Sequence, residues 1–305
     1  MAQSLLFCIL FLLFQPICGY GGEGGTLATA KSADYHQMMC LIQEGRMASV
    51  YLGYEAANPD VKVAIRVVSH TTPPAYYQQE LEGLRLQQSI SHRNILVVNA
   101  IGRTALGDLV AVFPYMPDGD LCGLINTMAD RQVWLSEPFV VDCAKAILAG
   151  VGYLHSQKII HRDVKPENIL CGAEPRDLKI TDFGFALFLP DGKKSTNRLG
   201  TTAYMAPSVY RGEEYGFEVD CWSAMVVFFT LATYEFPFKE SRKSSYYMGE
   251  IPSRCHLSPK MQAFFEAGFP ACVQNPEGYT VHCVEALLEQ HLMQLEAEAQ
   301  LSTPE

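Results

Sequence analysis

The stretch that decides the fold is His161-Arg162-Asp163-Val164-Lys165-Pro166-Glu167-Asn168. It is followed by Asp182-Phe183-Gly184 and later by Ala206-Pro207. Any one short motif occurs by chance in a chain of 305 residues. A long match followed by two further motifs in this order does not, so the three motifs must be interpreted together.

Composition indicates a folded domain of ordinary type. The chain is 49% hydrophobic and 18% charged, which is typical of a globular protein. Its 305 residues suit one two-lobed domain or two small ones. The net charge of -10 argues against a nucleic-acid partner and favours basic protein substrates.

The pattern of apolar residues divides the chain at a breaker cluster, residues 114–119 (Pro-Tyr-Met-Pro-Asp-Gly). Ahead of it, β-rich segments at 50–53, 61–68, 95–101 and 109–113 surround one helical segment, 76–88. Beyond it, apolar residues recur at helical spacing in 138–154, 219–234, 259–268 and 281–295. The pattern predicts a small β-rich lobe joined by a hinge to a larger helical lobe.

The N-terminus has the features of a targeting segment. Residues 5–14 are an unbroken apolar run that is too short to span a bilayer, so no stable membrane span is expected. We expect residues 1–19 to be a signal peptide, although no Lys or Arg precedes the run; an uncleaved anchor and a start without targeting function are the alternatives. A functional leader predicts the secretory pathway or secretion, and otherwise the protein is expected in the cytoplasm. The Gly-rich residues 20–34 are expected to be a flexible linker and 294–305 a polar tail.

Together the three motifs resemble the signature set of the eukaryotic protein kinase superfamily, serine/threonine type. The resemblance covers roughly residues 36–293. It implies an α+β, two-lobed protein kinase fold, with a small antiparallel sheet plus one helix and a larger, mainly helical lobe. The kinase domain is then expected over 35–293, with the N-lobe at 35–113, the hinge at 114–119 and the C-lobe at 120–293.

The resemblance implies a role for each polar residue of the C-lobe motifs. Asp163 accepts the proton of the substrate hydroxyl, and Lys165 contacts the transferred phosphoryl group. Asn168 and Asp182 hold Mg²⁺ through hard oxygen ligands. Thr201, in Gly-Thr-Thr-Ala-Tyr at 200–204, is expected to hydrogen-bond Asp163 and Lys165. The implied cofactors are ATP and Mg²⁺.

The N-lobe departs from the family pattern at two places. Residues 42–50 align with the Gly-rich loop over the ATP phosphates, but Gly45 is the one glycine kept of three, with Gln43 and Ala48 in the other places. Arg66, in Val-Ala-Ile-Arg at 63–66, stands where the family has a lysine that pairs with a helix glutamate. That glutamate is Glu82 or Glu80, and we favour Glu82 because its spacing to residues 92–94 needs the shorter insertion.

Nucleotide binding is otherwise expected to be intact. By the resemblance, the residues that contact ATP are Ile42, Gly45, Val50, Ala64, Arg66, Pro114, Met116, Leu170 and Asp182. Two functions are therefore predicted: an active ATP-dependent serine/threonine kinase, supported by Asp163, Lys165, Asn168 and Asp182, or a pseudokinase that binds nucleotide or acts as a scaffold, supported by Arg66 and the altered loop.

The resemblance also implies how the substrate and the activation segment are recognised. Asp120 and Glu167 match positions where related kinases receive a substrate arginine upstream of the Ser or Thr acceptor. Ser195 and Thr196 lie in the middle of the activation segment, where a phosphate on either would pair with Arg162.

Overall fold

The structure is a computed structural model that describes residues 15–16, 35–45, 47–55, 58–172, 174, 177–238, 256–274 and 278–290. Apart from Gln15 and Pro16, the expected signal peptide, linker and tail lie outside the described residues. The chain forms two compact units, and each is described by itself. Unit 1 comprises residues 1–91 and 96–116, and unit 2 comprises residues 92–95 and 117–305. The division falls inside the residues expected to form the hinge.

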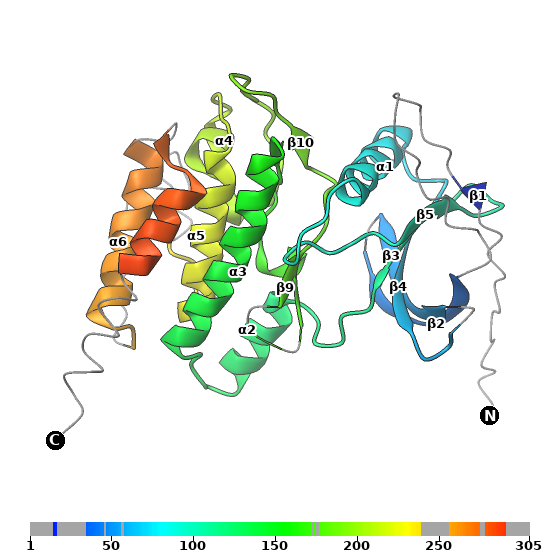
Figure 1. The fold of residues 1–305 in the computed structure, drawn as a ribbon, viewed down its shortest axis with the longest axis horizontal. Helices are drawn as coiled ribbons and strands as arrows, with labels where there is room; N and C mark the ends of the chain where they lie inside the picture. Colours follow the sequence, from blue (N-terminus) through cyan, green and yellow to red (C-terminus); the bar gives the residue numbers. More distant parts are fainter. Residues whose placement is uncertain are drawn as a thin grey trace. The chain divides into compact units, whose positions relative to one another are not determined.

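Unit 1 is an antiparallel sheet with one helix (Figure 1). The sheet order is β1-β5-β6-β4-β3-β2. Its core is formed by alternate residues of the strands, including Val63, Ile65 and Val112. The elements are β1 (Gln15–Pro16), β2 (Tyr35–Glu44), β3 (Ala48–Glu55), β4 (Lys62–Val68), α1 (Pro74–Gln88), β5 (Ala100–Arg103) and β6 (Leu109–Pro114).

The segment 95–101 is not the single strand that its apolar run predicts. Ile95 belongs to unit 2, where it forms an isolated bridge with Ile180, whereas Leu96 already belongs to unit 1. β5 begins later, at Ala100. The chain passes from one unit to the other within this run, and Val97 in its middle is 47% exposed. An apolar run alone cannot reveal such a division.

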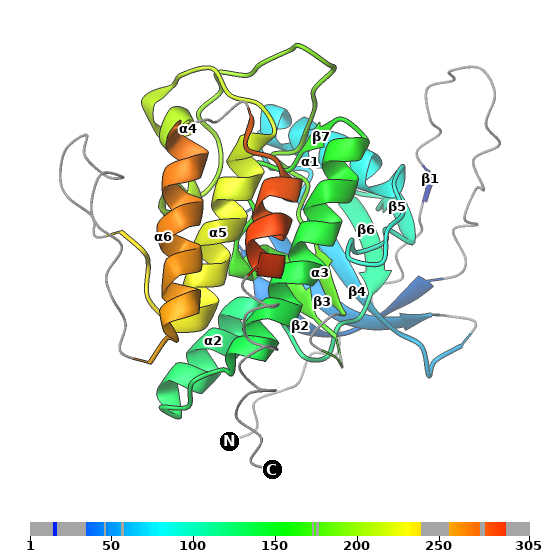
Figure 2. The same cartoon turned by 60° about the vertical axis from the view of Figure 1, so that its left-hand side comes forward.

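Unit 2 is mainly helical (Figure 2) and also contains two short two-stranded antiparallel sheets. Residues 281–290 are also helical. The elements are α2 (Leu121–Asp130), α3 (Glu137–Ser156), β7 (Ile159–Ile160), η1 (Pro166–Asn168), β8 (Ile169–Cys171), β9 (Leu178–Ile180), β10 (Leu187–Phe188), η2 (Thr202–Tyr204), α4 (Pro207–Arg211), α5 (Glu218–Thr233) and α6 (Pro259–Gln274).

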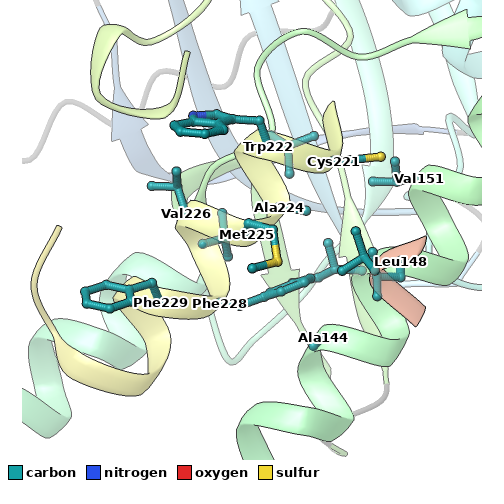
Figure 3. Packing of buried hydrophobic residues seen from close by; sticks show 14 of the residues in the cluster. Ala144, Leu148, Val151, Cys221, Trp222, Ala224, Met225, Val226, Phe228 and Phe229 are labelled. Carbon is teal, nitrogen blue, oxygen red and sulfur yellow. The ribbon is translucent and has the colours of Figure 1, made fainter. Parts of the chain in front are cut away.

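Helix α5 forms the centre of unit 2. Every residue from Glu218 to Thr233 is buried, as expected of a helix that is apolar on all sides. It packs against α3 on one side and α6 on another. Figure 3 shows the first of these contacts, where Cys221 and Phe228 of α5 lie near Val151 and Leu148 of α3. This packing gives the catalytic loop a rigid support.

Helix α3 also has the length and mean hydropathy, 1.2, of a membrane-crossing helix. It is the one such helix within the described part of the chain, and 56% of that apolar stretch is buried inside unit 2. It therefore contributes to the core of this unit, together with α5. Several cysteines share the same core, among them Cys143 on α3, Cys221 on α5 and Cys272 on α6. Unit 1 and unit 2 together have the antiparallel sheet and helical region of the predicted α+β, two-lobed fold.

Candidate active site

The catalytic loop that follows β7 is held by one buried carboxylate of α5. Asp220 is fully buried and accepts hydrogen bonds from the backbone N–H groups of His161 and Arg162, each at 2.8 Å. The imidazole Nε2 of His155 lies 3.1 Å from the same carboxylate. Burial alone would raise the pKa of Asp220, but the hydrogen bond and charge of His155, with the amide of His161, hold that pKa below its ordinary value.

Two residues of the site adopt left-handed backbone conformations. The φ angles of Arg162 and Asp182 are 67° and 62°, which cost non-glycine residues of order 1–3 kcal/mol and occur mainly at functional sites. Gly200, at φ 112°, is required for a different reason. A Cβ at this position would collide with the carbonyl oxygen of Arg162. The glycine therefore lets the activation segment, residues 182–207, touch the catalytic loop.

Asp163 is the centre of a closed network of hydrogen bonds. Its Oδ1 accepts from the backbone N–H of Thr201 at 2.8 Å and from the Thr201 hydroxyl at 2.7 Å. Its Oδ2 accepts from the Asn168 amide at 3.0 Å and pairs with Lys165 Nζ at 2.9 Å. Lys165 also donates to the Thr201 hydroxyl at 2.8 Å, so both contacts expected of Thr201 are present. The network ties the catalytic loop to the activation segment through a carboxylate that is 4% exposed.

In unit 1, Arg66 pairs with Glu80 of α1. Its Nη2 lies 2.8 Å from Glu80 Oε2, and the two side chains are 20% and 6% exposed. The choice of Glu82 was wrong: Glu82 is exposed and accepts a hydrogen bond from Gln78. Two residues correspond to about 200° around a helix, so Glu82 faces away while Glu80 shares the buried face with Leu84. The spacing from the glutamate to residues 92–94, on which the choice of Glu82 rested, does not show which face of the helix is buried.

The residues expected to contact ATP are divided between the two units. Arg66 and Ala64 lie on β4, Val50 on β3 and Ile42 on β2, where its side chain is 47% exposed. Pro114 ends β6, and Met116 is the last residue of unit 1. The other two residues belong to unit 2: Leu170 lies on β8, and Asp182 follows β9.

Gly45 lies at the turn between β2 and β3. Its N–H donates to the carbonyl of Ala48 at 2.9 Å, and a Cβ at Gly45 would approach that oxygen to 2.9 Å. The turn itself therefore requires this glycine, whatever its role toward phosphate. The neighbouring strand residue Gln43 pairs with Val50 in the sheet.

The geometry of the catalytic loop agrees with a comparison of the whole sequence. The family model described as protein kinase domain matches residues 36–270. The chain belongs to the protein kinase family. Its antiparallel sheet with one helix and its helical unit are the two parts that this family predicts.

Several curated proteins similar to this kinase domain are named serine/threonine-protein kinases. CBL-interacting serine/threonine-protein kinase 16 of Arabidopsis thaliana is 30% identical over 74% of this chain and 50% of its own length. Serine/threonine-protein kinase ULK1 of Homo sapiens is 28% identical over 72% of this chain and 21% of its own length. Serine/threonine-protein kinase GIN4 of Saccharomyces cerevisiae is 35% identical over 57% and 15%. The kinase domain thus spans half or less of the length of these relatives.

The residues expected to hold Mg²⁺ in this kinase domain are both polar oxygen donors. Asn168 is buried, and its amide nitrogen is used by the backbone and side chain of Asp163, so its carbonyl oxygen is the atom suited to a metal. Asp182 supplies a carboxylate. The described residues contain no group of three or more His, Cys, Asp or Glu that could hold a metal. The donor set fits Mg²⁺, which protein sites bind through one or two carboxylates together with substrate phosphates.

Sequence reasoning missed two residues that support the kinase motifs. His155, at the end of α3, contacts Asp220, and Tyr215, ahead of α5, contacts both the catalytic loop and the activation segment. A histidine six residues ahead of the catalytic loop was the available signal for His155. Tyr215 lies among polar residues of a loop and carried no signal of its own.

Proposed function

We propose that the chain is an ATP-dependent serine/threonine kinase that transfers the γ-phosphoryl group of Mg·ATP to a protein hydroxyl, at a rate reduced by Arg66. The observation that carries the proposal is the network around Asp163. Here donors from the catalytic loop and the activation segment converge on one carboxylate at 2.7–3.0 Å, which is the preorganisation that phosphoryl transfer requires.

The acceptor capacity of Asp163 indicates how a substrate hydroxyl enters. An ionised carboxylate has about four lone-pair positions, and the donors from Thr201, Asn168 and Lys165 occupy all of them. A substrate hydroxyl must therefore replace one donor. Lys165 is the donor that can leave, because its flexible ammonium can swing away, whereas the Thr201 N–H belongs to the backbone.

Release of Lys165 couples substrate entry to charge stabilisation. Once the substrate hydroxyl donates to Asp163, the ammonium of Lys165 is left beside Thr201 and is available to the transferred phosphoryl oxygens. Asp163 then takes the hydroxyl proton as the oxygen attacks phosphorus. Asn168 and Asp182 would hold Mg²⁺, which neutralises charge on the phosphates when bound.

The alternative is a pseudokinase that binds nucleotide or acts as a scaffold. It is favoured by Arg66, whose planar guanidinium replaces a compact ammonium, and by Gln43 and Ala48 in the Gly-rich loop. Arg66 nevertheless forms the expected type of ion pair with α1, through Glu80. The pairing supports activity because the helix partner is engaged.

Phosphotransfer from γ-labelled ATP to a basic protein substrate separates the two functions. We expect slow transfer to Ser or Thr by the wild type, and a loss of roughly a hundredfold or more in Asp163→Asn, which removes the acceptor of the hydroxyl proton. Asp191→Asn, a change at an 80% exposed side chain, is the matched control. A protein whose melting temperature rises with Mg·ATP but which transfers no label would be a pseudokinase.

We further propose that the substrate carries an arginine upstream of its acceptor residue. Asp120 precedes α2 and Glu167 lies in η1, two elements that contact one another. Asp120 also forms an isolated β-bridge with Leu170, three residues beyond Glu167. In addition to the effect of burial, both carboxylates raise the pKa of the Cys122 thiol. Two carboxylates so placed suit a guanidinium through charge-assisted hydrogen bonds.

The location of the protein is a separate proposal. The apolar run at residues 5–14 supports a signal peptide and the secretory pathway, with a cytoplasmic kinase as the alternative. Sequencing the N-terminus of protein recovered from the medium of expressing cells tests it. A mature chain that begins at Tyr20 is expected, and retention of Met1 in cytosolic protein would contradict it.

A further inference from the structure

Tyr215 is a fully buried tyrosine whose hydroxyl lies between the catalytic loop and the activation segment. The hydroxyl donates to the backbone carbonyl of Asn197 at 2.6 Å. It accepts from the Ser195 hydroxyl at 3.3 Å and from Arg162 Nη1 at 3.4 Å. One donor and two acceptor positions are all that a phenol offers, so its hydrogen-bonding capacity is filled.

The backbone reinforces the same contact. The N–H of Ser195 donates to the carbonyl of Tyr215, and the N–H of Tyr215 to the carbonyl of Ser195, each at 2.9 Å. The activation segment is therefore attached to the loop ahead of α5 by a main-chain pair and by a side chain. Four residues beyond Asn197, Thr201 makes its two hydrogen bonds to Asp163. The attachment thus stands just upstream of the catalytic network.

Arg162 is engaged in the same cluster. Its Nε donates to the carbonyl of Phe185 at 2.6 Å, and its Nη1 reaches Tyr215. Ser195 is 8% exposed, with its hydroxyl directed to Tyr215, and Asn197 has no hydroxyl to phosphorylate. Thr196, which lies between Ser195 and Asn197, is exposed. Its two neighbours already occupy hydrogen-bonding positions of the Tyr215 hydroxyl, so these positions are not available to a phosphate.

We propose that Tyr215 is a positioning residue that does for this kinase what a phosphate on the activation segment was expected to do. The hydroxyl joins Arg162 to the backbone of residues 195–197, so that the segment is held against the catalytic loop without covalent modification. Activity is then independent of phosphorylation of Ser195 and Thr196. The proposal rests on the proposed kinase activity for its kinetic test, but not for its structural one.

The structural test uses trypsin, because Lys193, Lys194 and Arg198 lie exposed on either side of the attachment. Tyr215→Phe removes the phenolic hydrogen bonds and is expected to raise the rate of cleavage at these sites about tenfold. Ser195→Ala removes one contact from the segment side, and about a threefold rise is expected. Tyr234→Phe is the matched control, since its hydroxyl bonds the backbone of Val133 and Leu135. Equal cleavage of Tyr215→Phe and Tyr234→Phe would overturn the proposal.

The kinetic test compares phosphotransfer before and after treatment with a phosphatase, with the loss of phosphate checked by intact mass. The wild type is expected to keep its activity within about twofold, as is Thr196→Ala. Tyr215→Phe is expected to lose about tenfold in kcat with an unchanged KM for ATP, because positioning and not nucleotide binding is affected.

The outcomes separate the two proposals. Loss of wild-type activity on phosphatase treatment would overturn the role of Tyr215. A wild type that transfers no phosphoryl group would instead refute the proposed function, while the trypsin rates would still decide the structural claim. If Tyr215→Phe melts too low to assay, Ser195→Ala and the phosphatase comparison remain decisive, and unchanged cleavage of Ser195→Ala with phosphatase-sensitive activity would refute the proposal.

Discussion

The catalytic loop of unit 2 and the Arg66–Glu80 pair of unit 1 hold their charged groups in different ways. Asp163 is 4% exposed and is surrounded by donors from three residues. Arg66 is 20% exposed at its side chain, and its Nη2 lies 2.8 Å from Glu80 Oε2. A carboxylate enclosed by several directional donors depends on the position of each of them, whereas an ion pair between opposite charges can form with either basic side chain, although the two place the charge differently. The departures from the family pattern at Gln43, Ala48 and Arg66 all lie in unit 1.

The largest expected effect on stability concerns the catalytic loop of unit 2, which Asp220 holds in place. Asp220→Asn presents an N–H₂ group to backbone N–H donors and leaves at least one of the amides of His161 and Arg162 without an acceptor. We expect a loss of about 3 kcal/mol in the free energy of unfolding, measured by denaturant melts. Asp191→Asn, at an exposed ion pair, should change it by less than about 0.5 kcal/mol.

The same variant has a defined pH dependence. The pKa of Asp220 in the folded protein is lower than its ordinary value of 3.8. Its stabilisation is therefore present above the unfolded-state pKa and is lost as the pH falls through the lower folded-state value. The stability difference between wild type and Asp220→Asn should be constant near neutral pH and should shrink only below about pH 4. A difference that shrinks already near pH 6 would contradict this assignment.

The next effect tests the pair in unit 1. Glu80→Gln removes the negative charge that faces Arg66. We expect kcat to fall between tenfold and a hundredfold, because a shift of the guanidinium by about 1 Å would misplace the phosphates that it orients. Glu82→Gln, two residues along the same helix, is the matched control and should match the wild type. Similar losses in both variants would show that helix stability, and not the ion pair, is responsible.

A smaller effect of opposite sign is expected from Arg66→Lys. Lysine presents a compact charge to the phosphates, and we expect turnover to rise at least tenfold, which is about 1.4 kcal/mol in the barrier. Single-turnover phosphotransfer at saturating Mg·ATP measures it. If the wild type is already as fast as the variant, the ion pair with Glu80 accommodates arginine without loss of rate, and the assignment of a slow rate to Arg66 is wrong.

The smallest effect concerns the surface acids of unit 2. Glu167→Ala should raise the KM for a peptide with an upstream arginine about fivefold, close to 1 kcal/mol, and leave the KM for ATP unchanged. Glu266→Ala, an exposed glutamate on α6, serves as the control. A peptide library that shows no preference for upstream arginine would refute this part of the proposal.

What could be predicted from the sequence depends on how far apart the interacting residues lie. Asp163, Lys165 and Asn168 are close neighbours in one motif, and their contacts follow from the motif itself. The partner of Arg66 was misassigned because residue counting cannot show which side of a helix is buried, although Leu81 and Leu84 mark the face that carries Glu80. Tyr215 could not have been found, because its partners come from two other segments.

The cysteines in the core of unit 2 give this kinase a built-in reporter of unfolding. Burial raises the pKa of the thiols of Cys143 and Cys171 to about 12, and that of Cys221 well above its ordinary value. At neutral pH these thiols carry almost no thiolate. Oxidants and alkylating reagents therefore react with them slowly, both in the secretory pathway and in the cytoplasm. Modification must wait until the core of unit 2 opens. The rate at which a thiol reagent labels these positions therefore times the opening of the core, and it does so even in variants that transfer no phosphate.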